Sequence, residues 1–175
     1  LQEKRMKTPM LASHKLCTGC RACAATCQFG AIAVWRENDG HFYPHVDNSA
    51  CVGCLQCEKV CPIQSAFEYG SNSMNSTPFK AWNNNEEQRL RSSSGGVFSA
   101  LATWFIENDG YVSGAVIDKL QIMHIVSSSI EDIKRMQGSK YLQSETVEAF
   151  KRILELLPDH KVLFSGTGCQ VAGLI

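Results

Sequence analysis

Two runs of the sequence, CTGCRACAATC at residues 17–27 and CVGCLQCEKVC at residues 51–61, decide how the first part of the chain folds. Both runs follow one spacing, C-x2-C-x2-C-x3-C, and together they hold eight of the nine cysteines of the 175-residue chain. These eight are Cys17, Cys20, Cys23, Cys27, Cys51, Cys54, Cys57 and Cys61. A spacing that occurs twice with matching intervals indicates that the cysteines of the two runs have the same function.

This spacing predicts two 4Fe–4S clusters, because bacterial two-cluster ferredoxins bind their clusters with it. Two-residue spacers wrap the backbone around a compact cube, so that three thiolates of one run reach three irons. The fourth iron takes its thiolate from the other run, so Cys61 completes the first cluster and Cys27 the second. Gly19 and Gly53 each precede the second cysteine of a run, where a missing Cβ permits positive φ.

Three other uses of the cysteines fit less well. Disulfides form in oxidising compartments, and no signal segment for export opens the sequence. Structural zinc sites usually take four sulfurs from two separated C-x2-C pairs, and a run of three closely spaced cysteines fits this poorly. Inert buried thiols would not repeat twice at one spacing. We therefore expect all eight cysteines to be cluster ligands, shielded from water by apolar residues such as Ile32, Val34, Phe42, Tyr43, Ile63 and Phe67.

The composition narrows the function classes. The chain has 17 basic and 17 acidic residues, so it lacks the net positive charge typical of nucleic-acid binding. No stretch reaches the roughly 20 apolar residues of a membrane span. We expect a cytoplasmic protein that binds no nucleic acid and has no membrane span.

The order of patterns along the chain predicts an α+β ferredoxin-like two-cluster module followed by an α/β domain. In the module, residues 31–35 and 41–46 flank Asn38-Asp39-Gly40 and are expected to form a hairpin. The expected domains are a two-cluster domain at 1–70, a linker at 71–78 and part of an α/β domain at 79–175.

The second part alternates helical and strand patterns. Helices are expected at 97–107, after Ser129 and after Ser144, where serines can cap them, and strands at 110–117, 122–126 and 162–164. The chain stops inside a helix that begins near residue 168, and we expect the α/β domain to continue beyond it.

Two motifs of this part could bind an anionic cofactor. SSSGGVFSAL at residues 92–101 places hydroxyls and glycines at a helix start, which suits a phosphate but equally suits a serine-capped helix without a ligand. GSKY at 138–141 adds Lys140, which can pair a phosphate or stay solvated. Neither the G-x-G-x-x-G fingerprint nor the phosphate-loop motif is present, so an ordinary Rossmann or nucleoside-triphosphate site is excluded.

Taken in order, SSSGGVFSAL, GSKYLQS and VLFSGTGCQVAGL, together with the cysteine runs, resemble the β-subunits of coenzyme F-420 hydrogenases and dehydrogenases. The resemblance implies a two-cluster module that exchanges electrons with an FAD held by the α/β domain. It also implies a C-terminal region beyond residue 175. The residues that it implies for the flavin site are Ser94, Gly95, Gly96, Val97, Ser139, Lys140, Tyr141, Thr167, Cys169 and Gln170. It gives no catalytic residue, since hydride chemistry belongs to the flavin.

Cys169, the ninth cysteine, follows the turn Ser165–Gly168 at the start of a predicted helix. It could contact the flavin, ligate a further metal, or simply be a small buried residue. These alternatives stay open at this point.

We therefore expect an oxidoreductase subunit that passes electrons between two 4Fe–4S clusters and a flavin. The flavin would exchange hydride with a soluble carrier, a deazaflavin coenzyme being one candidate, or with another substrate, and other redox subunits are expected partners. An alternative is a flavin-free adaptor that docks a larger redox enzyme. A third is a module whose clusters serve structure or redox sensing.

Overall fold

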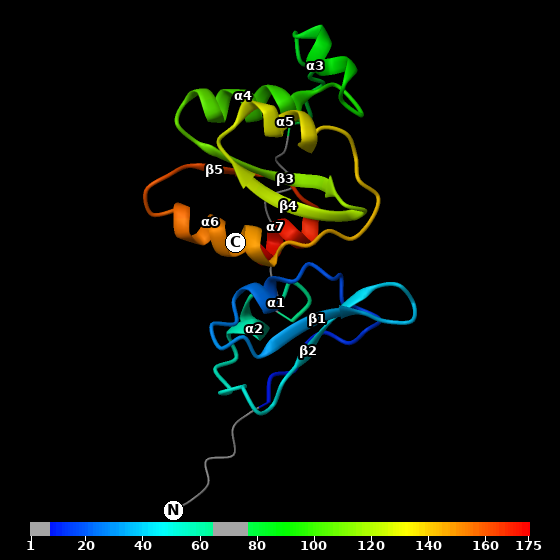
Figure 1. Cartoon of the computed structure of the whole chain (residues 1–175), viewed down its shortest axis with the longest axis vertical. Helices are drawn as coiled ribbons and strands as arrows, with labels where there is room; N and C mark the ends of the chain where they lie inside the picture. Colours follow the sequence, from blue (N-terminus) through cyan, green and yellow to red (C-terminus); the bar gives the residue numbers. More distant parts are fainter. Residues whose placement is uncertain (1–7, 65–76) are drawn as a thin grey trace, which may run out of the picture. The chain divides into compact units, whose positions relative to one another are not determined.

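The computed structural model describes residues 8–64 and 77–175, and the chain divides into two compact units (Figure 1). The first unit comprises Leu1–Ala66, Glu145–Lys151 and Thr167–Ile175. The second unit comprises Phe67–Ser144 and Arg152–Gly166. The units are therefore not contiguous in sequence, because two segments from the last third of the chain belong to the cysteine-rich unit. The predicted linker 71–78 lies mostly outside the described residues.

The first unit contains the predicted hairpin, which is confirmed. Strands β1 (Ile32–Arg36) and β2 (Phe42–Val46) pair antiparallel, with Ile32 opposite Val46 and Arg36 opposite Phe42. The Asp39 carboxylate closes the turn by accepting hydrogen bonds from the backbone N–H of His41 and the hydroxyl of Tyr43. An Asp-Gly turn between β-prone runs thus forms as its residue types predict.

Each cysteine run of the first unit forms a turn and a short helix that the sequence did not predict. Helix α1 (Ala22–Ala25) follows Arg21, and helix α2 (Gln56–Lys59) follows Leu55. Arg21 and Leu55 occupy equivalent positions and share a left-handed backbone, with φ of 64° and 59°. Gly19 and Gly53 also have positive φ, as predicted, so the two runs follow the same backbone path. The first unit also takes in helix α7 (Gly168–Leu174) and the beginning of helix α6 (Val147–Leu156).

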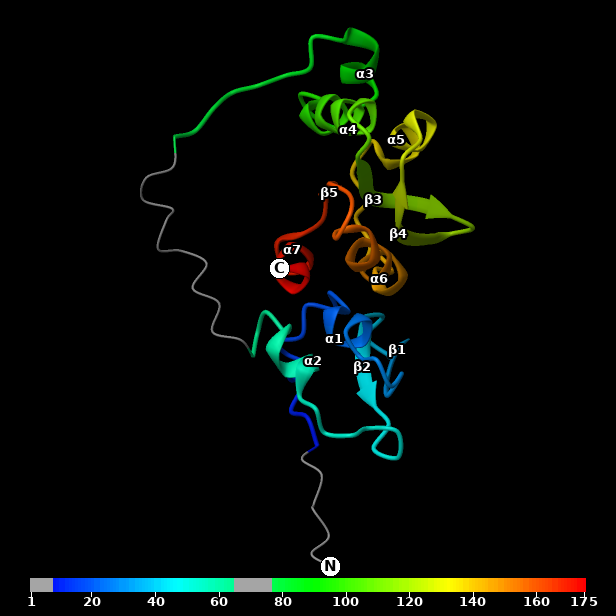
Figure 2. The same cartoon turned by 90° about the vertical axis from the view of Figure 1, so that its left-hand side faces the viewer.

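The second unit contains a three-stranded sheet. Strands β3 (Tyr111–Asp118) and β4 (Gln121–Ser127) pair antiparallel, and β5 (Val162–Phe164) pairs parallel with β3, giving the order β4-β3-β5. Helices α4 (Val97–Glu107) and α5 (Ile130–Met136) cover one face of the sheet (Figure 2). Between them lies a core formed by Ala102, Val112, Val116, Ile133 and Met136. The described part of the chain is thus a mixed α/β structure with two small sheets.

Helix starts in the second unit differ in part from the predictions. Ser129 caps α5 as predicted, with its side chain accepting from the N–H of Glu131. Helix α4 begins as predicted, but its N-cap is Gly96, with φ 74° and no side-chain cap hydrogen bond, so the serine-capped alternative is wrong. A further short helix, α3 (Glu86–Leu90), was not predicted.

Helix α6 begins at Val147 rather than immediately after Ser144, and the Glu145 carboxylate accepts the N–H of Val147 at 2.8 Å. The predicted cap at Ser144 is therefore wrong. Physically, a carboxylate at a helix start both accepts an N–H and interacts favourably with the helix dipole.

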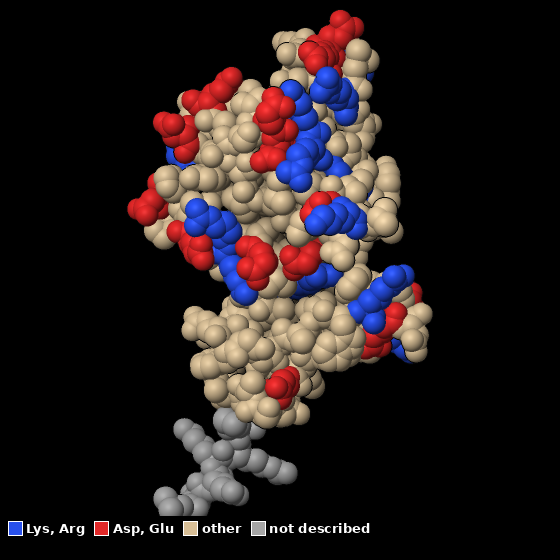
Figure 3. Space-filling view, viewed as in Figure 1, with Lys and Arg blue, Asp and Glu red and all other residues tan. Residues whose placement is uncertain are grey.

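The surface carries charges of both signs. On the face drawn in Figure 3, basic and acidic side chains are interspersed over the second unit, and few charged side chains cover the first unit. Three apolar side chains of α4, Val97, Leu101 and Trp104, are 40%, 48% and 54% exposed, although their spacing is that of one helix face.

Replacing Gly173 with Ala should destabilise the first unit. An added Cβ would lie 2.6 Å from the Cβ of Ala22, so α7 and α1 would have to separate. We expect the free energy of unfolding to fall by about 1–3 kcal/mol, the usual cost of overpacking, in denaturant titrations followed by circular dichroism.

Gly168→Ala is the matched control on the same helix, because nothing lies within 4 Å of its added Cβ. It should change the free energy of unfolding by less than about 0.5 kcal/mol. Equal effects of the two substitutions would contradict close packing of α7 on α1.

Candidate functional site

Four cysteines line a cavity in the first unit, and they come from both runs. Cys17, Cys20 and Cys23 of the first run share it with Cys61 of the second. The cavity encloses about 420 Å³, part of it open to solvent. Three of the residues expected to shield a cluster, Val34, Phe42 and Ile63, also line it.

A second cavity, of about 340 Å³, has the reciprocal arrangement. Its sulfurs are those of Cys51, Cys54 and Cys57 from the second run and Cys27 from the first. Ile32 lines it, as expected for a shielding residue. Tyr43 is buried but lies in neither lining, and Phe67 is outside the described residues.

Burial and mutual repulsion disfavour the thiolate form of these cysteines. The pKa of the Cys23 thiol is raised to about 12, first by burial and then by three neighbouring thiols, those of Cys20, Cys61 and Cys17. The pKa of the Cys57 thiol is also raised, again mainly by burial, and Cys54 and Cys27 contribute. Thiolates gathered in an apolar cavity therefore need a cationic group among them, and iron supplies one.

The residues present fit a cubane cluster. Each cavity offers four sulfur atoms, no other metal-ligating side chain among the described residues that line it, and mostly apolar walls. Within residues 8–64 and 77–175, no three His, Cys, Asp or Glu side chains meet closely enough to chelate a single ion. Four cysteines line each cavity, and four thiolates are what a 4Fe–4S cluster requires.

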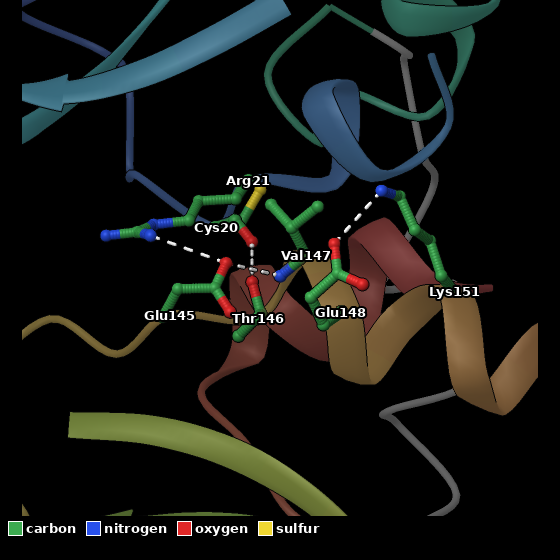
Figure 4. Close-up of polar contacts among 7 residues, drawn as sticks. All are labelled: Cys20, Arg21, Glu145, Thr146, Val147, Glu148 and Lys151. Atoms are coloured by element: carbon green, nitrogen blue, oxygen red, sulfur yellow. Dashed lines mark hydrogen bonds and ion pairs between the residues drawn. The ribbon is translucent and has the colours of Figure 1, made fainter. Parts of the chain in front are cut away.

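Two residues of the first cavity lining, Cys20 and Arg21, make polar contacts that the sequence did not predict (Figure 4). Arg21, between two of the cysteines, lines the cavity and forms an ion pair with Glu145 at 3.5 Å. The hydroxyl of Thr146 donates to the backbone carbonyl of Cys20 at 2.8 Å. These contacts join positions more than 120 apart in the sequence, so no local pattern could have revealed them.

Cys169 also belongs to the first unit, beside the first set of sulfurs. After burial, its thiol is among the neighbours that raise the pKa of Cys17 and of Cys20. The side chain of Cys169 is partly buried, and its sulfur lies 3.1 Å from the Thr167 hydroxyl. The Gln170 side chain accepts the N–H of Thr167 at 2.8 Å and thereby caps α7.

The other residues expected at the flavin belong to the second unit, and their two motifs meet there. The N–H of Ser139 donates to the Ser93 hydroxyl at 2.7 Å. Close packing explains why residue 95 is a glycine, since an added Cβ would lie 2.7 Å from the carbonyl oxygen of Ala81. Ser94 is exposed, Val97 is exposed at the start of α4, and Tyr141 is 90% exposed.

Lys140 has a structural role at the end of α5. Its ammonium donates to the carbonyl oxygens of Arg135, Met136 and Gln137 at 3.0, 2.8 and 2.8 Å. All three N–H donors of the lysine are thus used, which suits a cation at a helix C-terminus. Burial lowers the pKa of the ammonium. The ammonium of Lys140 is therefore partly exposed and hydrogen-bonded to the backbone.

Comparison with known proteins adds the family context. Residues 16–65 match the model of the 4Fe-4S dicluster domain, and residues 78–151 match that of the coenzyme F-420 hydrogenase/dehydrogenase, beta subunit N-term. The chain is 26% identical to a subunit of the F(420)H(2) dehydrogenase of Methanosarcina mazei, over 94% of this chain and 49% of that protein. It is 35% identical to an archaeal-type glutamate synthase (NADPH) of Thermotoga maritima, over 38% of this chain and 12% of that protein.

The chain thus spans about half the length of the dehydrogenase subunit that it matches. In the part that the structure describes, no helix is long and apolar enough to cross a membrane. The expected resemblance is confirmed: the first part of the chain matches the 4Fe-4S dicluster domain, and the second part matches the N-terminal model of coenzyme F-420 hydrogenase/dehydrogenase beta subunits.

Proposed function

We propose that the chain is the electron-transfer part of a cytoplasmic oxidoreductase subunit, in which the eight cysteines hold two 4Fe–4S clusters that exchange electrons with a flavin. The observation that carries the proposal is the crossed arrangement of sulfurs. Each cavity takes three cysteines from one run and the fourth from the other. Such crossing is the ligation pattern of two-cluster ferredoxins.

The protein residues would hold the clusters and set their environment. Cys17, Cys20, Cys23 and Cys61 would ligate the first cluster, and Cys27, Cys51, Cys54 and Cys57 the second. Apolar side chains around the sulfurs exclude water, which tunes the reduction potential. A 4Fe–4S cluster exchanges one electron at a time, whereas a flavin can take up two electrons as hydride and release them singly.

The flavin assignment rests on the second unit. Helix α4 begins there without a side-chain cap, so its first N–H groups remain available to an anion such as a flavin phosphate. The Ser139–Ser93 hydrogen bond brings the GSKY segment to the same region. We infer that Ser94, Gly95, Gly96, Val97, Ser139 and Tyr141 contribute to this site. The relative that is named as part of an F(420)H(2) dehydrogenase supports a reduced deazaflavin as the hydride donor.

One observation favours a flavin-free adaptor that docks a larger redox enzyme. The ammonium of Lys140, expected to pair a phosphate, is occupied by three carbonyl oxygens of α5. If the remaining motif residues are likewise structural, the second unit serves only docking. Flavin quantification in the anaerobically purified full-length protein separates the two functions, since the proposal requires about one flavin per chain and the adaptor none.

Paired cysteine substitutions test which sulfurs share a cluster. The intact protein should contain about eight iron and eight sulfide per chain. Because Cys23 and Cys61 line one cavity, Cys23→Ala/Cys61→Ala should lose one cluster and keep about four iron. Because Cys57 and Cys61 line different cavities, Cys57→Ala/Cys61→Ala should lose nearly all iron.

The reverse result, with the Cys57/Cys61 variant keeping half of the iron, would show that each run binds its own cluster. Colourless protein with zinc in the cysteine sites would refute the proposed function. Far-UV circular dichroism of each variant controls for loss of folding.

Two neighbouring substitutions test the flavin site. Tyr141 is 90% exposed, so Tyr141→Ala should change stability by less than about 0.5 kcal/mol. If the ring contacts the flavin, the same change should weaken flavin binding at least about tenfold, a loss of about 1.4 kcal/mol. The measurement is equilibrium dialysis of FAD against the full-length protein.

Lys140→Met should have the opposite profile. It removes the cation at the end of α5 and should lower stability by about 1 kcal/mol, with flavin binding unchanged. If Tyr141→Ala binds FAD as tightly as the unsubstituted protein, Tyr141 is not part of the flavin site.

A further inference from the structure

The residue directly after the second cysteine differs in charge between the two runs. Arg21 in the first run and Leu55 in the second hold the same left-handed backbone conformation. Each lines the cavity that its own run forms. Among the described residues that line the cavities, Arg21 is the one Lys, Arg, Asp or Glu in the first lining, and the second lining has none.

Arg21 is a buried cation. Its side chain is only 8% exposed, and its guanidinium carbon lies 4.7 Å from the centre of the Phe42 ring. Its Nε is buried and has no hydrogen-bond partner among the described residues. Burial lowers the pKa of the guanidinium and Glu145 raises it, but an arginine side chain remains protonated in proteins. A buried cation with an unused donor calls for a negative neighbour.

Glu145 supplies part of that negative charge from a distant segment. Its carboxylate lies 3.5 Å from Arg21 and is 31% exposed, so solvent screens it more than it screens the guanidinium. The same carboxylate accepts the N–H of Val147, and Thr146 donates to the Cys20 carbonyl, which fixes the segment against the first cysteine run (Figure 4). Residues 145–147 lie within the part of the chain that matches the beta-subunit model.

We propose that Arg21 and Glu145 set the reduction potential of the cluster held by the first cavity, with Arg21 raising it and Glu145 lowering it. The inference rests on the proposed presence of two 4Fe–4S clusters. A cube with four thiolates is an anion, and one-electron reduction adds a negative charge without transferring an atom. A nearby fixed cation therefore stabilises the reduced form, and a carboxylate destabilises it.

Opposite shifts in two variants test this charge effect. Arg21→Leu gives the first run the residue that the second run carries at the same backbone conformation, and should lower the midpoint potential of one cluster. Glu145→Gln keeps an oxygen to accept the N–H of Val147 and should raise the same potential. We expect at least about a threefold change in the reduced-to-oxidised ratio at fixed potential for each, tenfold corresponding to 59 mV for one electron.

The measurement is a mediated redox titration with dithionite, followed by electron paramagnetic resonance, on the anaerobically purified full-length protein. Lys151→Gln and Glu148→Gln are matched controls, because that ion pair is on the same segment but is 46% and 78% exposed. Both should leave the potentials unchanged, since exposed charges are screened. Arg21→Lys, which keeps the positive charge, should keep the potential close to that of the unsubstituted protein.

The outcomes separate the inference from the proposed function. Shifts in the same direction for Arg21→Leu and Glu145→Gln would indicate loss of packing and overturn the charge effect. Unchanged potentials with full iron content would also overturn it. Absence of clusters from the unsubstituted protein would instead refute the proposed function. If Arg21→Leu alone loses its cluster, Glu145→Gln still tests the proposal. A rise in the midpoint potential supports the charge effect, and a fall overturns it.

Discussion

The exchange of one cysteine between the two runs is the constraint on which the first unit depends. The buried core cluster of this unit consists mainly of small side chains, those of Cys23, Ala24 and Cys57. Its large buried side chain is that of Ile32. So little apolar burial gives limited stability in a small unit. A metal cluster that joins both runs would close the loop between them and link metal binding to folding. The same sulfurs that are proposed to carry electrons would then hold the fold together.

The first unit is enlarged by two segments from the end of the chain. In the segment 145–151, Val147 packs against the core that contains Cys23 and Cys57. Gly173 of α7 approaches Ala22 so closely that a methyl group would not fit. These segments supply apolar contacts that the cysteine runs cannot make among themselves. Sequence far beyond the cysteines thus contributes to the surroundings of the first cavity.

Local patterns could be predicted from the sequence, and long-range pairings could not. The sulfur sets, the hairpin at Asp39-Gly40 and the bounds of α4 follow from spacing and residue type over a few positions. The Arg21–Glu145 ion pair joins residues 124 positions apart and leaves no periodic signal. The contacts of Lys140 are local and still did not follow from the sequence, because its charge fits a phosphate or a helix end equally well until the carbonyls at the end of α5 are placed.

The two cysteine runs are equal in spacing and unequal in charge, and this difference bears on the direction of electron transfer. If Arg21 raises the potential of the first cluster while Leu55 leaves the second without a cation, the first cluster is the easier one to reduce. An electron that enters at the second cavity would then move to the first. Glu145, which is proposed to lower this potential, lies in the part of the sequence that matches the beta-subunit model. The repeated cysteine motif would therefore provide two cluster sites. The difference between Arg21 and Leu55 would make one cluster easier to reduce than the other and so set the direction of electron transfer.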